Sequence, residues 1–286
     1  MIACARAFGR REFPKEVWTM HILVTNDDGV QAPGLLALVQ ALRGIPGAEV
    51  SVLAPHKNWS VTGHSKTLDR PLRVWPVRLA DGTPAWASDG GPADCVALAV
   101  LGVIEARLDL VVSGINPHGN LGHDVTYSGT VAAAMEAVLA GVPSLAVSLE
   151  GKERLRSVDD YRAAAAVAGA IAAWVLAHGL PGGVFLNVNV PHRPAGGLRG
   201  VQLTRLGRRI YRDRLVRRED PWGRPYYWIG GERPTGVPEP GTDIGALAEG
   251  WVSITPLHMD LTATHALGAL ADLAQEGVLG NWREIP

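Results

Sequence analysis

Two adjacent carboxylates, Asp27 and Asp28, are the residues whose types and spacing most directly suggest chemistry. They follow the apolar run 21–25, which is typical of a buried strand, and an amphipathic segment led by Pro33 begins shortly afterwards. Like charges this close raise each other's pKa unless a cation holds the pair. A divalent metal at the mouth of an α/β sheet is the simplest candidate, and it indicates phosphate chemistry. The alternative is that the acids cap and charge-stabilise the start of a helix.

Further oxygen-bearing side chains follow other predicted strands. Ser60 lies in the loop after the strand predicted at 49–55, and Asn116 follows the strand predicted at 108–114. In doubly wound sheets, ligands bind beyond the carboxyl ends of the strands, where strand order reverses. We therefore expect the acidic pair, Ser60 and Asn116 to converge on one site. Carboxylate, hydroxyl and amide oxygens suit Mg²⁺, Mn²⁺ or Ca²⁺ better than zinc.

The segment 128–131 (SGTV) opens an alanine-rich helix and predicts an anion site. The amides of Gly129, Thr130 and Val131 would point at a phosphate there, with hydroxyl donors from Ser128 and Thr130. The alternative is that Ser128 merely caps the helix. A second glycine-containing turn at 120–122 would lie on the same rim.

From His21 to Pro191, strand-like runs alternate with helical ones. Strands are predicted at 21–25, 49–55, 108–114, 143–150 and 184–190, and helices at 33–44, 92–104, 128–141 and 161–179. The runs 72–77 and 83–88 predict a β-excursion between the second strand and the second helix. Continuous apolar strands separated by helices indicate a Rossmann-like, doubly wound, mainly parallel α/β sheet.

After Pro191 the composition changes. Residues 192–240 are rich in Arg, Pro, Gly and aromatic side chains, which predicts a protruding arm or hairpin, and the C-terminal segment 241–286 predicts a strand at 251–257 and a helix at 264–275. The run Arg205–Arg218 holds seven arginines, and we interpret it as an exposed arm face or as ion pairs across an oligomer interface. Residues 1–19 are interpreted as a disordered tail or an upstream-start extension, which leaves 20–286 as a single α/β domain.

Composition excludes several classes of protein. The chain has 286 residues, of which 47% are hydrophobic and 34 are glycine, which is typical of an α/β enzyme. A net charge of −1 argues against a general polyanion binder, so nucleic acid is not an expected partner. Cys4 and Cys95 give no disulfide framework and favour a reducing cytoplasm. The apolar run 163–177 is too short and too rich in alanine to span a membrane, and it predicts a packed helix.

Several long motifs resemble the SurE family of stationary-phase survival proteins, which are metal-dependent nucleoside monophosphate phosphatases. The matching segments are NDDGVQAPG (26–34), PADCV (92–96), SGIN (113–116), NLGHDVTYSGTVAAAMEA (120–137) and VSITPLHMDLT (252–262). The resemblance covers about residues 20–262, and the order of so many motifs makes it specific. The loop Pro55–Val61 departs from the family pattern Pro-Asp-x-x-x-Ser-Gly, and His118 stands where glycine is common.

The resemblance implies a set of roles. It places the ligands of one divalent metal ion per subunit on Asp27, Asp28, Ser60 and Asn116, with Asp27, Asp28 and Asn116 as catalytic residues, and adds Asn26, Asn120, Ser128, Gly129 and Thr130 to the substrate pocket. It also implies nucleoside 5′- and 3′-monophosphates as substrates, with short polyphosphate as a further class. A homodimer or homotetramer built by exchange of C-terminal arms is the implied assembly.

Two alternatives stay open. One is a haloacid-dehalogenase-like phosphatase with an aspartyl nucleophile, although that chemistry normally spaces its two aspartates by one residue. The other is a non-catalytic nucleotide- or RNA-binding protein that uses the Arg205–Arg218 run. The proton acceptor is either Asp27 or Asp28. Among the loop histidines 56, 64, 118 and 123, His118 is the nearest to Asn116 as a proton donor, and Asp124 is expected to hold its loop by accepting backbone hydrogen bonds.

Overall fold

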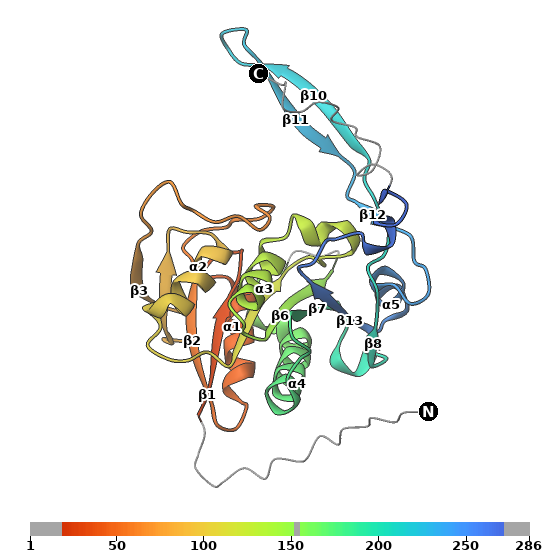
Figure 1. Ribbon diagram of the computed structural model, residues 1–286. Helices are drawn as coiled ribbons and strands as arrows, with labels where there is room; N and C mark the ends of the chain where they lie inside the picture. Colours follow the sequence, from red (N-terminus) through yellow and green to blue (C-terminus); the bar gives the residue numbers. More distant parts are fainter. Residues whose placement is uncertain (1–18, 152–154, 272–286) are drawn as a thin grey trace, which may run out of the picture.

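A nine-stranded, mostly parallel sheet lies between two layers of helices in the computed structural model, which describes residues 19–151 and 155–271 (Figure 1). The strands are, in chain order, β1 (Met20–Thr25), β2 (Ala48–Pro55), β3 (Val74–Arg78), β4 (Pro84–Ser88), β5 (Leu110–Asn116), β6 (Ser144–Glu150), β7 (Val184–Pro191), β8 (Val201–Leu203) and β13 (Val252–His258). The helices are α1 (Pro33–Arg43), α2 (Pro92–Leu98), α3 (Gly129–Leu139), α4 (Arg162–His178) and α5 (Asp243–Glu249).

Strand order confirms the predicted fold class. The order is β3-β4-β2-β1-β5-β6-β7-β13-β8, and the strands from β4 to β7 are parallel. The chain moves outward from β1 to β2 and β4, then returns to β5 on the other side of β1. This reversal between β1 and β5 is the switch point at which doubly wound sheets bind ligands.

The strands are continuously apolar because both faces of the sheet are covered. Ile22 and Val24 of β1 join the core shared with α1 and α4, whereas Leu23 packs on the opposite face with the core of α2 and α3. Alternate side chains of a strand point to opposite faces, so a strand covered on both sides needs apolar residues at every position.

Helix α1 lies very close to β5. The helix begins at Pro33, because an amide hydrogen in the first turn has no partner within the helix and proline can therefore lack it there. The helix ends before its C-cap residue, Gly44. A side chain at Gly34 would collide with the carbonyl oxygen of Ile115, so glycine is required at this close approach. The contact fixes α1, and with it the β1–α1 turn, against the end of β5.

Two predicted helices differ from the structure, and one predicted strand has a direction that the sequence analysis did not specify. The helix predicted at 92–104 is α-helical only as far as Leu98. A short π-helical segment, η1 (Ala99–Val103), follows it, and Gly102 in this segment has a φ of 111°. The strand predicted at 251–257 is present as β13, which runs antiparallel to β7. In place of the first part of the helix predicted at 264–275, the structure has a 3₁₀ turn, η5 (Thr264–Ala266). Residues 272–275 of that helix lie outside the described residues, and so do residues 1–18 of the predicted N-terminal extension.

A β-hairpin extends away from the body of the molecule (Figure 1). Its strands are β10 (Asp213–Glu219) and β11 (Pro225–Gly231), paired in antiparallel register. The base of the hairpin is a second small ladder between β9 (Arg209–Ile210) and β12 (Thr235–Gly236).

Among the described residues, one helical stretch, Val158–His178, is long and apolar enough to cross a membrane. It contains α4, which packs against α1 and the strands β5, β6 and β7. Ala164, Ala168 and Ala172 are fully buried in this contact. The stretch is therefore a covering helix of the sheet, as the sequence predicts.

Candidate active site

A cleft of about 560 Å³ lies beyond the carboxyl ends of β1 and β5, at the switch point of the sheet. Six of the residues predicted for the site line it: Asp27, Asp28, Ser60, Asn116, Asn120 and Ser128. They come from the β1–α1 turn, the loop after β2, the last residue of β5 and the segment after it, and the start of α3, so the fold gathers residues that lie far apart in the sequence.

The β1–α1 turn is held by Asn26. Its side-chain Oδ1 accepts a hydrogen bond from the Gly29 amide (3.2 Å), and its Nδ2 donates to the Gly29 carbonyl (3.0 Å). Gly29 has a φ of 107°, which is easy only for glycine. Asn26 is fully buried and does not line the cleft. It therefore shapes the turn that presents Asp27 and Asp28.

The two carboxylates lie in a poorly hydrated environment. Burial raises the pKa of Asp27, although the hydrogen bond from Thr130 opposes this effect. Burial and the charge of Asp27 together raise the pKa of Asp28 to about 7. The pair thus carries an electrostatic cost that a bound cation would relieve.

The start of α3 is built around Asp27. The Thr130 hydroxyl donates a 2.6 Å hydrogen bond to Asp27 Oδ1, and a side chain at Gly129 would come within 2.7 Å of the Asp27 Cβ. The Ser128 hydroxyl accepts a hydrogen bond from the Val131 amide (3.1 Å). Ser128 therefore caps the helix, and the Val131 amide is not free to bind an anion. Gly129 and Thr130 do not line the cleft. The Gly129 amide makes no hydrogen bond within the described residues, whereas the backbone of Thr130, like its side chain, stabilises the Asp27 carboxylate by a hydrogen bond.

The loop after β2 is tied to the acidic pair by Asn58, a residue that the sequence analysis missed. Its Nδ2 donates to Asp28 Oδ1 (3.3 Å), and its Oδ1 accepts the Ser60 amide (2.8 Å). The next residue, Val61, has a φ of 61°, a conformation that is costly for a β-branched side chain. The departure from the family's Ser-Gly pattern thus falls on a residue with left-handed backbone.

The segment after β5 is anchored by the neighbouring strands. The Asn120 amide donates to Asn189 Oδ1 (2.9 Å), its carbonyl accepts from Asn187 Nδ2 (2.9 Å), and its side chain donates to Ser148 Oγ (2.8 Å). The signal for these partners is present in the sequence, because buried asparagines interrupt the apolar run of β7. Glu150, at the end of β6, also lines the cleft and accepts the Gly119 amide.

Of the four loop histidines, only His118 lines the cleft. Its carbonyl accepts the Asn116 Nδ2 at 2.5 Å. His56 contacts the Ser88 carbonyl, and His64 pairs with Glu136.

Asp124 does not have the predicted role. Its carboxylate accepts hydrogen bonds from the side chains of Arg209 (2.6 Å) and Tyr211 (2.5 Å) rather than from backbone amides. Both partners lie at the base of the hairpin and line the cleft. This part of the arginine run therefore belongs to the cleft wall and not to an exposed arm face.

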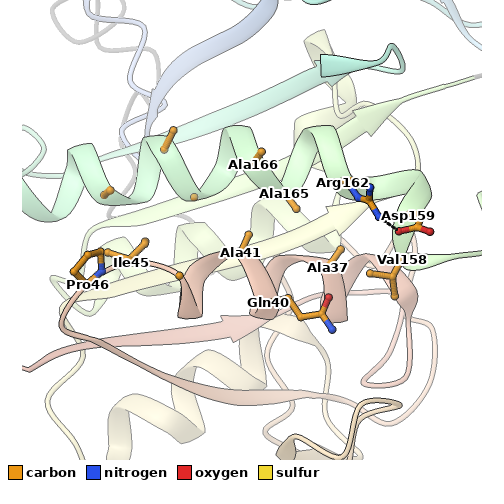
Figure 2. Close-up of a pocket in the computed structure, with 14 residues that line it drawn as sticks. Ala37, Gln40, Ala41, Ile45, Pro46, Val158, Asp159, Arg162, Ala165 and Ala166 are labelled. Carbon is orange, nitrogen blue, oxygen red and sulfur yellow. Dashed lines mark hydrogen bonds and ion pairs between the residues drawn. The ribbon is translucent and has the colours of Figure 1, made fainter. Parts of the chain in front are cut away.

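A second depression of about 560 Å³ lies between α1 and α4 (Figure 2). It is lined largely by alanine and glycine, and its charged residues, Asp159 and Arg162, are paired with each other. No set of polar groups converges there from the described residues, so the cleft at the switch point is the candidate active site.

The fold and the cleft define a doubly wound α/β protein with two adjacent carboxylates at its switch point. The profile of the family described as "Survival protein SurE" matches residues 22–213. The chain belongs to the SurE family.

Similar proteins support this assignment over most of the chain. A protein of Herpetosiphon aurantiacus named "5'-nucleotidase SurE" is 56% identical over 243 residues, which are 85% of this chain and 94% of that protein. A protein of the same name from Chloroflexus aggregans is 53% identical over 85% of this chain and 95% of its own length. The crystal structure of the SurE protein from Aquifex aeolicus is 41% identical, covers 89% of this chain and 99% of its own, and gives a TM-score of 0.74.

Proposed function

We propose that this protein is a metal-dependent phosphomonoesterase that hydrolyses nucleoside 5′- and 3′-monophosphates to nucleoside and phosphate. The observation that carries the proposal is the convergence of Asp27, Asp28, Ser60 and Asn116 in one cleft. The name 5'-nucleotidase, shared by its close relatives, supports the same reaction class.

The residues of the cleft fit a divalent cation. A buried and a half-buried carboxylate with raised pKa values share the cleft with a hydroxyl and an amide oxygen, a donor set typical of Mg²⁺ or Mn²⁺. No group of three or more His, Cys, Asp or Glu gathers within residues 19–151 and 155–271, so this part of the chain offers no zinc-type cluster. Asp27, Asp28, Ser60 and Asn116 would hold the ion, which supplies charge neutralisation and a more acidic bound water.

The chain's own groups would bind and orient the phosphate. The Gly129 amide, at the positive end of the α3 dipole, is available to donate to a phosphate oxygen, whereas Thr130 holds Asp27 through its hydroxyl and its backbone. Asn120 is fixed by Ser148 and Asn189, so its position costs no reorganisation when substrate binds. His118 lines the cleft and is our candidate for protonating the leaving oxygen.

The binding-protein alternative finds no support in the structure. Within the arginine run, Arg205, Arg209, Arg212 and Arg217 pair with acids of the same chain. These pairs reduce the charge that the run presents to a polyanion.

We also propose a homodimer or homotetramer in a cytoplasmic setting. The hairpin exposes a dense set of large apolar side chains, which supports an assembly through this arm: Leu215, Trp222, Tyr226, Tyr227, Trp228 and Ile229.

The test is phosphate release from nucleoside 5′- and 3′-monophosphates with Mn²⁺, with Mg²⁺ and with EDTA, beside the Asp28→Asn variant. We expect metal-dependent release that the variant loses. Release that survives EDTA and the substitution would contradict the metal site. Trapping of a phosphoaspartyl intermediate would favour the haloacid-dehalogenase-like alternative.

A further inference from the structure

The base of the hairpin forms a wall of the cleft that the phosphate chemistry does not use. Tyr211, Arg233 and Pro234 come from the two chain segments of this base, and Tyr127 comes from the segment before α3. The side chains of Tyr127 and Tyr211 are 57% and 40% exposed. Two tyrosine rings thus lie in the same cleft as the acidic pair.

This wall is held in place by buried and half-buried contacts. Asp124 accepts hydrogen bonds from both Arg209 and Tyr211, and the ion pair with Arg209 is largely shielded from solvent. Because one carboxylate holds two side chains of the hairpin base, the Tyr211 ring is fixed at the cleft wall through its hydroxyl.

A second carboxylate fastens the hairpin base to the body. Asp243 is fully buried, and its oxygens accept the amides of Gly122 (2.8 Å) and Gly207 (2.7 Å). Gly122 lies just before Asp124, and Gly207 lies just before Arg209. The contact therefore fixes the distance between the tyrosine wall and the segment that carries Asn120 and Ser128.

We propose that Tyr127 and Tyr211 bind the nucleoside part of the substrate, with the base stacked on the tyrosine rings and its polar edge toward Arg233. This inference rests on the proposed function, which assigns the acidic end of the cleft to the phosphate. A nucleobase has two apolar faces and a polar edge, which matches rings beside a cation. Arg233 lines the cleft and forms no ion pair within the described residues, so its donors are available.

The test compares two substrates that differ only in the base, a purine nucleoside 5′-monophosphate and ribose 5-phosphate. Tyr127→Ala and Tyr211→Ala should each lower kcat/KM for the nucleotide about tenfold, mainly through KM, because stacking contributes that much per base. Hydrolysis of ribose 5-phosphate should stay unchanged. Trp174→Ala is the matched control, since Trp174 is an aromatic residue 54% exposed on α4, away from the hairpin, and it does not line the cleft.

Equal losses for both substrates, or no loss for either, would overturn the proposal. Inhibition by the free nucleoside gives a second readout, and its inhibition constant should rise in the Tyr127→Ala and Tyr211→Ala variants but not in Trp174→Ala. Should Tyr211→Ala fail to fold, Tyr127→Ala decides the result alone, because the Tyr127 side chain makes no hydrogen bond within the described residues. Failure of the proposed function is a separate outcome, namely no phosphate release by the wild type from any substrate.

Discussion

At the scale of single residues, the acidic pair is the feature that most destabilises the folded chain electrostatically. Asp27 and Asp28 are adjacent, poorly hydrated and supported mainly by neutral donors, Thr130 and Asn58. Such a pair lowers the stability of the metal-free fold, and this cost is typical of residues kept for function rather than for folding.

This cost predicts how stability depends on pH without metal. The pKa of Asp28 is about 7 in the fold, against 3.8 ordinarily. Between these values the folded protein keeps a proton that the unfolded chain has released, so stability falls as the pH rises from about 4 to about 7. Asp28→Asn removes this titration, and it should stabilise the protein in EDTA at pH 8 by at most roughly 4 kcal/mol.

Urea unfolding of wild type and Asp28→Asn in EDTA, at pH 5 and pH 8, would measure the effect. The free energy of unfolding of the variant should exceed that of the wild type by a large amount at pH 8 and by a smaller amount at pH 5. An equal difference at both pH values would show that the carboxyl of Asp28 does not titrate abnormally in the fold.

At the scale of elements, the sequence predicts most of the sheet because its signals are local. Apolar runs locate β1, β5, β6 and β7, and the polar residues after β1 and β5 then fall at the switch point. The direction of β13 was not predictable, because one apolar strand can pair with β7 in either orientation. The roles of Arg209 and Tyr211 were equally hidden, since their partner Asp124 lies 85 and 87 residues away.

The junction between the β1 turn and α3 gives a prediction at this scale. Gly129 lets the start of the helix approach Asp27, and an added methyl group would lie 2.7 Å from the Asp27 Cβ and 3.2 Å from Pro92. Gly129→Ala should therefore displace Asp27 and reduce kcat by at least about a hundredfold, since small misplacements of site groups are costly. Phosphate release at saturating substrate and metal measures this.

Gly182→Ala is the matched control, because nothing lies within 4 Å of its added Cβ and its φ is not left-handed. It should retain full turnover. Comparable turnover in Gly129→Ala and Gly182→Ala would show that the approach of α3 to Asp27 is not required for the reaction.

At the scale of the whole molecule, the hairpin is the part whose stability is not explained by contacts within a single chain. A two-stranded hairpin is marginally stable alone in water, yet β10 and β11 extend from the body (Figure 1), and nearly all of their residues are exposed. Leu215 and Ile229 lie opposite each other in the register and are 69% and 85% exposed. Apolar surface of this kind is stabilised by burial against another chain.

Replacing this pair tests the proposed assembly while keeping the hairpin itself. In Leu215→Lys with Ile229→Glu, the opposite charges face each other across the strands and support the pairing, but the apolar surface is lost. Light scattering after size exclusion should give a multiple of the chain mass for the wild type and a smaller assembly for the double variant. Leu101→Lys, at a residue 84% exposed on the body, should leave the assembly unchanged. A wild type that is already a single chain, or a double variant of unchanged mass, would show that the hairpin does not hold subunits together.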